Sequence, residues 1–208
     1  MNQDHKPEGK QSFIAAARRE QIIEAAVQTL DDIGYVNASL AKIAKQAGIS
    51  TALISYHFSD KNDLMNHLLI KLVERSSSYI LERVNQGRTP EEKLEAYIAA
   101  SLAYQVTHPA HQTALIEIIF NARTPEQVPY YKLGAEEDEE DALMSTLHSI
   151  LREGQQQGVF GNFHVTVMAN VIQGSIGEYM LNTSTKDVDL ETYSSELISI
   201  IQQATKKQ

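Results

Sequence analysis

Side chains that can contact phosphates and base edges are concentrated in residues 50–61. Serine, threonine, tyrosine and histidine fill much of this segment, and a lysine ends it. If the segment is a helix, Ile54 and Phe58 lie four residues apart and face a core, which leaves Tyr56 and His57 exposed beside hydroxyl neighbours. An exposed tyrosine–histidine pair is easier to explain by contacts to phosphates and bases than by core packing. A three-helix core that binds no ligand is the alternative.

Two short helices must position these side chains. Apolar residues at helical spacing predict the first helix, which Ser39 begins and Gly48 ends. Ser50 begins the second helix, which reaches to about Phe58. Because only Gly48, Ile49 and Ser50 join the two helices, the pattern predicts a helix-turn-helix motif. The second helix of such a motif enters the major groove of DNA.

Helical periodicity also dominates the rest of the chain, and no segment shows the alternation of a strand. Before the helix-turn-helix, another helix is predicted from about residue 14 to 33, and Gly34 ends it. The segment 89–92 is a strong helix start, and the segment Thr124-Pro125-Glu126-Gln127 repeats its pattern. The predicted fold class is all-α, with nine or ten helices. The later helices are expected at about 60–86, 90–107, from 109, 135–157, 164–181 and 190–205.

Composition and charge narrow the class of protein further. The 208 residues contain no cysteine, which excludes disulfides and thiolate nucleophiles. No run approaches the roughly 18 apolar residues of a membrane span. The net charge is −9, yet residues 1–58 carry 6 basic and 6 acidic side chains, whereas residues 59–208 carry 12 and 21. The neutral N-terminal part can therefore approach a polyanion. We expect a cytoplasmic protein without a cofactor or a metal site.

The N-terminal residues resemble a known signature. The resemblance is to the DNA-binding segment of the TetR (tetracycline repressor-like) family of transcriptional regulators, and it is carried by Ala44-x-x-Ala47-Gly48-Ile49-Ser50 and by Ile54-Ser55-Tyr56-His57-Phe58-Ser59-x-Lys61-x-x-Leu64. It covers residues 14–65, and the later part is similar only in length and helical content. The resemblance implies a flexible tail at 1–12, a three-helix DNA-binding domain with the helix-turn-helix at 13–60, and a helical ligand-binding and dimerisation domain at 61–208.

The resemblance also implies which side chains contact a double-stranded DNA operator. In the family pattern the hydroxyls at the two helix starts are contacts, the tyrosine–histidine pair reaches the backbone, and the final lysine is nearly universal. Thr51, Ala52 and Ser55 depart from frequent family residues, so we expect a different operator sequence. The implied DNA-binding residues are Ser39, Ser50, Thr51, Leu53, Ser55, Tyr56, His57 and Lys61.

Two helices near the C-terminus carry apolar stripes that are candidates for a dimer interface. Gly174 and Gly177 interrupt the first stripe, and glycine inside a helix suggests a close approach of another helix. Burial within one chain is the alternative, and the family resemblance favours a homodimer with a four-helix interface. The predicted interface residues are Met168, Val171, Ile172, Ser175, Ile176, Tyr179, Tyr193, Leu197, Ile200 and Ile201.

Polar and aromatic side chains punctuate the otherwise apolar helices between residues 65 and 180. A ligand pocket combines apolar walls with a few polar anchors, so these positions are candidates for a small-molecule effector site. Surface exposure or an ordinary core contact is the alternative for each of them. The candidate pocket residues are Tyr97, Ser101, Tyr104, His108, Glu117, Asn121, His148, Gln173 and Glu178.

These observations favour one function. We expect a homodimeric, ligand-responsive transcriptional regulator, a repressor that leaves a palindromic operator when a small molecule binds its C-terminal domain. The chain has no phosphate-binding glycine loop and no hydrolase or zinc-protease motif, so we do not expect an enzyme. An α-helical enzyme that uses a C-terminal cavity, or a helical adaptor for a basic partner protein, are the alternatives.

Overall fold

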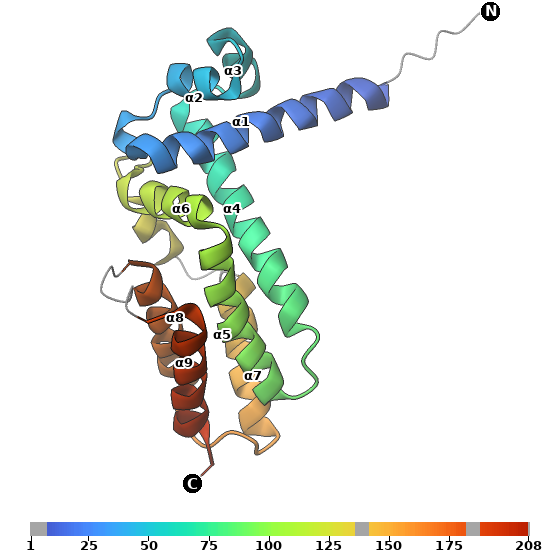
Figure 1. The fold of residues 1–208 in the computed structure, drawn as a ribbon, viewed down its shortest axis with the longest axis vertical. Coiled ribbons are helices and arrows are strands. Elements are labelled where there is room, and N and C mark those ends of the chain that lie inside the picture. Colours follow the sequence, from blue (N-terminus) through green and yellow to red (C-terminus); the bar gives the residue numbers. More distant parts are fainter. Residues whose placement is uncertain (1–7, 136–141, 182–187, 208) are drawn as a thin grey trace, which may run out of the picture. The chain divides into compact units, whose positions relative to one another are not determined.

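The computed structural model describes residues 8–135, 142–181 and 188–207, which divide into two compact units (Figure 1). Unit 1 comprises Met1–Leu72 and Thr113–Leu133, and unit 2 comprises Val73–Gln112 and Gly134–Gln208. The described residues form nine α-helices, one 3-10 helix and two isolated β-bridges, and they contain no extended strand. The predicted all-α fold class is therefore confirmed. The predicted functional boundary at residue 60 lies inside unit 1 and stays a prediction.

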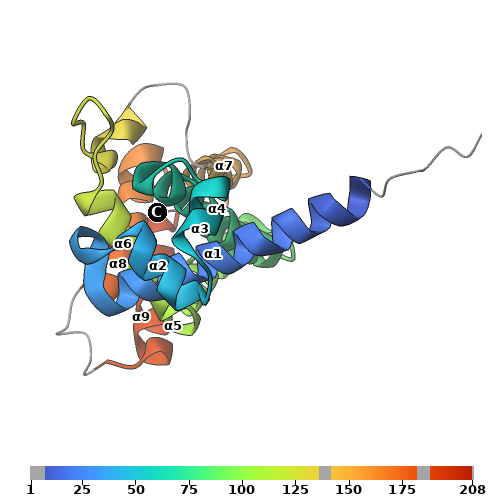
Figure 2. The same ribbon diagram turned by 90° about the horizontal axis from the view of Figure 1, so that it is seen from above.

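Unit 1 is built on its three N-terminal helices. Helix α2 (Leu40–Ala47) packs along α1 (Glu8–Asn37), and α3 (Thr51–His57) follows α2 after a short turn (Figure 2). The first part of α4 (Lys61–Val84) and most of α6 (Pro109–Asn121) complete the unit. Its fully buried side chains come from every one of these helices, among them Ile22, Leu30, Ile43, Ile54, Phe58, Leu64, Met65, Leu68 and Ile118.

The local sequence signals place the ends of these helices correctly. The hydroxyl of Ser39 accepts a hydrogen bond from the amide of Lys42, so this serine caps α2 as predicted. Gly48 ends α2 with φ at +66°, a left-handed conformation that favours glycine. Gly34 has φ at +72° and interrupts the helical geometry of α1, as its predicted role as a helix end requires.

Helix α1 begins earlier than the sequence analysis predicts. It already includes residues 8–12, which were assigned to a flexible tail, while residues 1–7 of that tail lie outside the described residues. Helix α1 can begin this early because the stretch after Pro7 contains no helix breaker beyond Gly9 and is rich in alanine and charged helix formers. The beginning of α1 extends beyond α2 and α3 (Figure 2).

The second predicted helix start, at Thr124, is wrong. The amide of Thr124 donates to the carbonyl of Val128 at 2.9 Å, and Gln127 adopts φ at +65°, so the segment forms a turn. A bridge between Arg123 and Pro129 closes it. Pro129 explains the error, since a proline so soon after the start clashes with a continuing helix. The 3-10 helix Tyr130–Ala135 follows.

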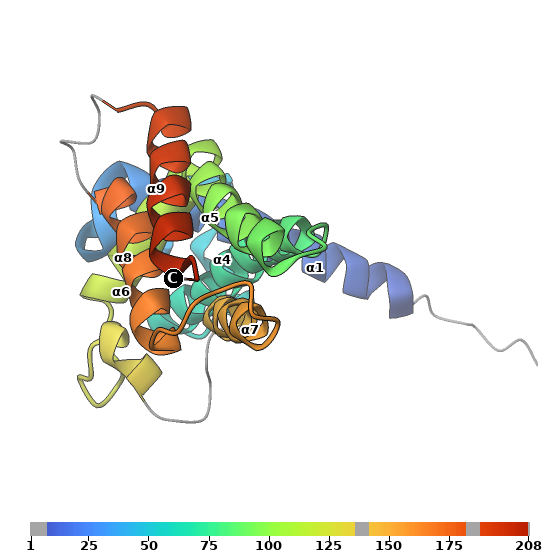
Figure 3. The same cartoon turned by 90° about the horizontal axis from the view of Figure 1, so that it is seen from below.

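Unit 2 is an α-helical cluster around one apolar core. It contains the second part of α4 together with α5 (Pro90–Thr107), α7 (Ala142–Gln156), α8 (Val165–Leu181) and α9 (Leu190–Thr205). Helix α5 packs against α7, α8 and α9, and Figure 3 shows it beside α9. Helix α7 was expected from residue 135, but residues 136–141 lie outside the described residues. The core includes Ile80, Leu94, Tyr97, Leu102, Leu147, Leu151, Ile172 and Ile201.

We expect Gly154→Ala to destabilise unit 2. A Cβ at this position of α7 would lie 2.1 Å from Cδ2 of the Phe160 ring, which is itself buried. The ring and the backbone must shift, so the free energy of unfolding should fall by roughly 1–3 kcal/mol. Urea denaturation of the two proteins measures the difference. Ser145→Ala, at an exposed position of the same helix, is the control and should leave the midpoint unchanged.

Candidate nucleic-acid interface

The second helix of the motif, α3, presents a polar face. Ser50 accepts a hydrogen bond from the amide of Leu53 at 3.2 Å and so fixes the start of the helix. Ile54 and Phe58 point into the core with at most 1% of their surface exposed, whereas Tyr56 is 81% exposed. Thr51 and Ser55 are exposed, and Leu53 and His57 are partly exposed. The orientation that the four-residue spacing predicts is therefore the one observed.

The two capping hydroxyls already have one hydrogen bond each. The side-chain oxygens of Ser39 and Ser50 accept from backbone amides at 3.3 and 3.2 Å. A hydroxyl that accepts in this way keeps its own proton for donation. Both serines can therefore cap their helices and donate to a phosphate oxygen at the same time.

His57 lies edge-on to Tyr56, with ring centroids 5.1 Å apart. Burial lowers the pKa of His57 below its ordinary value, and the positive charges of Arg19 and Arg18 lower it further. The imidazole is therefore neutral near pH 7 and offers one N–H donor and one acceptor. The phenol of Tyr56 adds a second donor on the same exposed face.

The side chain of Lys61 makes contacts within unit 1. Its ammonium nitrogen donates to the carbonyl oxygen of Tyr35 at 2.5 Å and lies 4.0 Å from the centre of the Tyr35 ring. Partial burial lowers the pKa of Lys61. This lysine connects the start of α4 to the turn after Gly34, a role that the spacing of the sequence does not reveal. A phosphate contact through its remaining protons stays a prediction.

A hydrogen-bonded network missed by the sequence analysis fixes the end of α3. Asp63 accepts from the amide of Ser59 at 2.8 Å and from its hydroxyl at 3.2 Å, and these bonds hold the pKa of Asp63 below its ordinary value. His67 Nδ1 lies 3.1 Å from the other oxygen of Asp63, and its Nε2 lies 3.1 Å from the Arg19 guanidinium. Because arginine only donates, Nε2 must accept and Nδ1 must carry the proton. The spacing of four residues between Ser59, Asp63 and His67 is the sequence pattern that could have predicted this network.

The predicted effector-pocket residues belong to both units, and their assignment to a pocket stays a prediction. Tyr97, Ser101, Tyr104 and His148 are buried in unit 2. Within that unit the phenol of Tyr97 accepts from Nε2 of Gln173 at 2.8 Å. The rings of Tyr104 and His108 stack 4.4 Å apart, and Glu178 is exposed.

Glu117 and Asn121 belong to unit 1, whereas the other predicted pocket residues belong to unit 2. The carboxylate of Glu117 accepts from the amide of Tyr35 at 2.7 Å and from the Asn121 side chain at 3.2 Å. It also lies beside Gly34, where an added Cβ would be 3.2 Å from its oxygen. The structure therefore places these two residues at the Gly34 turn.

The predicted dimer residues divide between the core and the surface. Ile172, Ile176, Leu197 and Ile201 are buried within unit 2, as the alternative of burial within one chain expects. Met168, Ser175, Tyr179 and Tyr193 are partly exposed, and the phenol of Tyr193 donates to the carbonyl of Ser175 at 2.6 Å. Val171 and Ile200 are at least half exposed, as are Val167 and Leu181, which the sequence analysis missed.

We expect His111 to make unit 2 sensitive to acid. Burial lowers the pKa of His111, and Arg75 and His108 lower it further. Its ring lies 5.2 Å from that of His108, and Nδ1 is 3.1 Å from the Tyr104 phenol. The His111 imidazole binds a proton more readily in the unfolded chain than in the folded one. The stability that depends on neutral His111 is therefore present above about pH 6.5 and is lost below it. His111→Asn should reduce the fall in urea midpoint between neutral and mildly acidic pH. An unchanged fall would assign the acid sensitivity to other groups.

A capped helix-turn-helix with an exposed polar second helix is typical of DNA-binding helical proteins. Residues 22–68 match the model of the family described as bacterial regulatory proteins, tetR family. This match covers the second part of α1, all of α2 and α3, and the first part of α4. The resemblance to the TetR family is therefore confirmed for the N-terminal segment.

Curated relatives extend the likeness over a similar region. The chain is 37% identical over 89 residues to the transcriptional regulator BetI of Stenotrophomonas maltophilia, which covers 41% of this chain and 44% of the relative. It is 35% identical over 82 residues to BetI 1 of Chromohalobacter salexigens, which covers 39% and 41%. The match thus spans less than half the length of these curated relatives.

Solved structures of several regulators have a similar fold over about nine tenths of this chain. The fatty acid degradation regulator FadR from Bacillus halodurans matches with a TM-score of 0.75 and 22% identity, over 92% of this chain and 97% of that one. The TetR family regulator PfmR from Thermus thermophilus matches with a TM-score of 0.71 and 18% identity, over 91% and 96%. FadR from Bacillus subtilis, solved with stearoyl-CoA, matches with a TM-score of 0.72 and 24% identity, over 88% and 96%. Within the described residues, no helix is long and apolar enough to cross a membrane.

Proposed function

We propose that the protein is a DNA-binding transcriptional regulator that acts in the cytoplasm as a repressor. The observation that carries this proposal is α3, a capped recognition helix that buries Ile54 and Phe58 and exposes Thr51, Ser55 and Tyr56. This helix lies in the segment that matches the tetR family model. The relatives and neighbours named above are regulators, which supports this reading over an enzyme or an adaptor.

A homodimer is part of the proposal, and α8 supports it. The exposed positions Val167, Val171, Gly174, Glu178 and Leu181 follow one another at spacings of 4, 3, 4 and 3 residues. Such a stripe faces a single direction and is the pattern that a second helix covers. Among the described residues, nothing lies within 4 Å of an added Cβ at Gly174 or Gly177. We infer that α8 and α9 of two chains form the four-helix interface.

We expect Gly174→Leu to weaken the dimer and to leave the chain folded. A Cβ added at this exposed position has no described atom within 4 Å, and leucine favours a helix more than glycine does. A close helix of the second chain would collide with it. Analytical ultracentrifugation should show a monomer where the unchanged protein is a dimer. Arg152→Leu, at an exposed position of α7, is the control. Equal dimer affinity in both variants would place the interface elsewhere.

A small-molecule effector site in unit 2 completes the proposal. Two buried oxygens there, Oγ of Ser77 and Oε1 of Gln105, have no hydrogen-bond partner among the described residues. Such oxygens are costly unless a donor from water or a ligand reaches them. The neighbour that was solved with stearoyl-CoA supports a fold that accommodates a ligand.

Helix α4 provides the coupling in this proposal. Residues 61–72 of α4 belong to unit 1, and residues 73–84 belong to unit 2. An effector that binds unit 2 differently in two positions of α4 shifts the population of those positions. The two recognition helices of the dimer then lose the spacing of one DNA turn, about 34–36 Å or a multiple, that a palindromic operator requires.

Selection from a random double-stranded DNA pool tests the regulator directly. The full chain is incubated with the pool at low and at moderate salt, and the retained sequences are read. One enriched palindrome is the expected result, because a two-fold dimer reads two equal half-sites. A pool that stays random at both salt concentrations overturns the proposal.

A further inference from the structure

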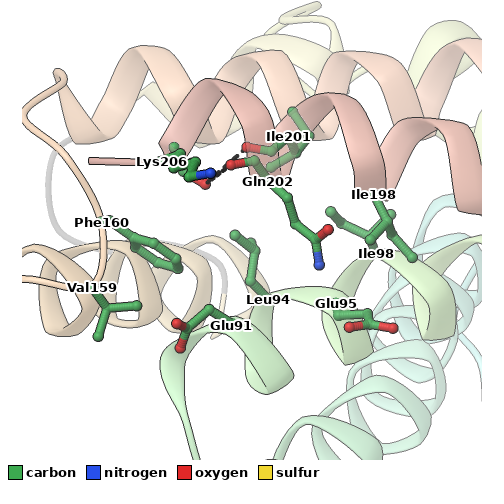
Figure 4. A pocket seen from close by; sticks show the side chains of 11 residues that line it. Glu91, Leu94, Glu95, Ile98, Val159, Phe160, Ile198, Ile201, Gln202 and Lys206 are labelled. Carbon is green, nitrogen blue, oxygen red and sulfur yellow. Dashed lines mark hydrogen bonds between the residues drawn. The ribbon is translucent and has the colours of Figure 1, made fainter. Parts of the chain in front are cut away.

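A cavity of about 190 Å³ lies in unit 2 between α5, α9 and the turn before α8 (Figure 4). Its walls are apolar and are formed by Leu94, Ile98, Val159, Phe160, Ile198 and Ile201. None of the residues predicted to line an effector pocket contributes to it. An apolar cavity of about 150 Å³ is known to hold a benzene ring, so this one has room for a ring with a short substituent.

The rim of the cavity carries two carboxylates on one helix. Glu91 and Glu95 are one turn apart on α5 and flank Leu94, and Figure 4 shows both on the α5 side of the cavity. Both side chains are exposed, and neither has a hydrogen bond or an ion pair among the described residues. Glutamates four residues apart repel each other on a helix. A cation placed between them would relieve that repulsion.

The neighbouring surface has the same sign of charge. A second hollow along α9 shares Glu95, Ile198 and Gln202 with the cavity and is also lined by Asp189 and Glu191. Lys206 at the far rim is the one basic side chain that lines either hollow. The carboxylates therefore outnumber the ammonium groups, and the potential at the mouth favours a positive ligand.

We propose that this cavity binds a small organic cation, an amine with an apolar body of about the size of a benzene ring. The body fills the space between Leu94, Ile98 and Phe160, and the ammonium group lies at the mouth between Glu91 and Glu95. Apolar walls with a few polar groups at one end are the usual construction of a ligand site. This site is separate from the DNA-binding surface, and its test requires no DNA.

Isothermal titration calorimetry of the full chain with benzylamine tests the proposal. Benzyl alcohol and phenylacetate, which keep the ring but lack the positive charge, are the matched ligands. We expect benzylamine to bind more tightly than both. The double variant Glu91→Gln/Glu95→Gln should weaken benzylamine about tenfold, since each exposed ion pair accounts for a few-fold. It should leave benzyl alcohol unchanged.

A second variant tests the contribution of the apolar cavity independently of the two carboxylates. Val159→Phe fills the cavity and should abolish binding of benzylamine, while circular dichroism confirms the fold. Glu126→Gln, a glutamate in unit 1 that lines neither hollow, should have no effect. Three results would overturn the proposal: no heat with benzylamine, equal affinity for phenylacetate, or full binding by the Val159→Phe variant. A failed selection of DNA would leave this test unaffected.

Discussion

Tyr56→Phe and His57→Ala are each expected to weaken binding of the selected operator about 30-fold. Tyr56 is 81% exposed, so its phenol contributes little to folding and is free to contact a phosphate. Each change removes one hydrogen bond from each recognition helix, and such a bond contributes about 1 kcal/mol. A two-fold dimer loses it twice, so the loss is about 2 kcal/mol. Fluorescence anisotropy with the selected palindrome measures the change.

The structure provides a matched control for this experiment. Tyr131 is another exposed tyrosine of unit 1, outside the helix-turn-helix, and Tyr131→Phe should keep the affinity of the unchanged protein. Circular dichroism should show equal helix content in all variants. If Tyr56→Phe and His57→Ala both bind the palindrome as tightly as the control, the contacts lie on another surface.

Phe58→Ala is expected to unfold much of unit 1. The ring is 1% exposed, lies 5.4 Å from the His67 ring edge-on, and has the Arg19 guanidinium 4.8 Å from its centre. Truncation of a buried phenylalanine costs about 3–5 kcal/mol. A small domain has only about 5–15 kcal/mol in total, so the recognition helix loses its support. Urea denaturation followed by circular dichroism measures the loss.

Phe58→Leu distinguishes the loss of packing from a loss of contacts to DNA. Leucine keeps most of the apolar volume, so we expect a destabilisation of less than about 1.5 kcal/mol and nearly full DNA affinity. A Phe58→Ala protein with an unchanged urea midpoint would contradict the view that this ring anchors the end of α3.

Local chemistry made much of the fold predictable. Serine or threonine before a helix, proline at its first position and glycine after it act through backbone hydrogen bonds and φ angles nearby. The start of α5 at Thr89 and Pro90 and the end of α2 at Gly48 are examples. The inward Ile54 and outward Tyr56 also follow from spacing alone.

Nonlocal contacts were not predictable in the same way. The carboxylate of Glu117 accepts from the amide of Tyr35, which is 82 residues away in sequence, and the prediction that Glu117 lines a ligand site did not include this contact. Spacing carries no information about such a partner. The predicted interface stripe on α8 includes buried positions because α8 is apolar on several faces, and a periodic pattern then has no unique direction. The observed burial of Ile172 and Ile176 shows which face of α8 points into the core.

Unit 1 is discontinuous in sequence, and this determines when it can form during synthesis. A ribosome releases the chain from the N-terminus, so α1, α2 and α3 emerge well before Thr113–Leu133, the segment that completes the unit. Until then the amide of Tyr35 lacks the Glu117 carboxylate, and Asn66 lacks the phenol of Tyr130. More than half of the chain must therefore be synthesised before the unit that supports α3 is complete.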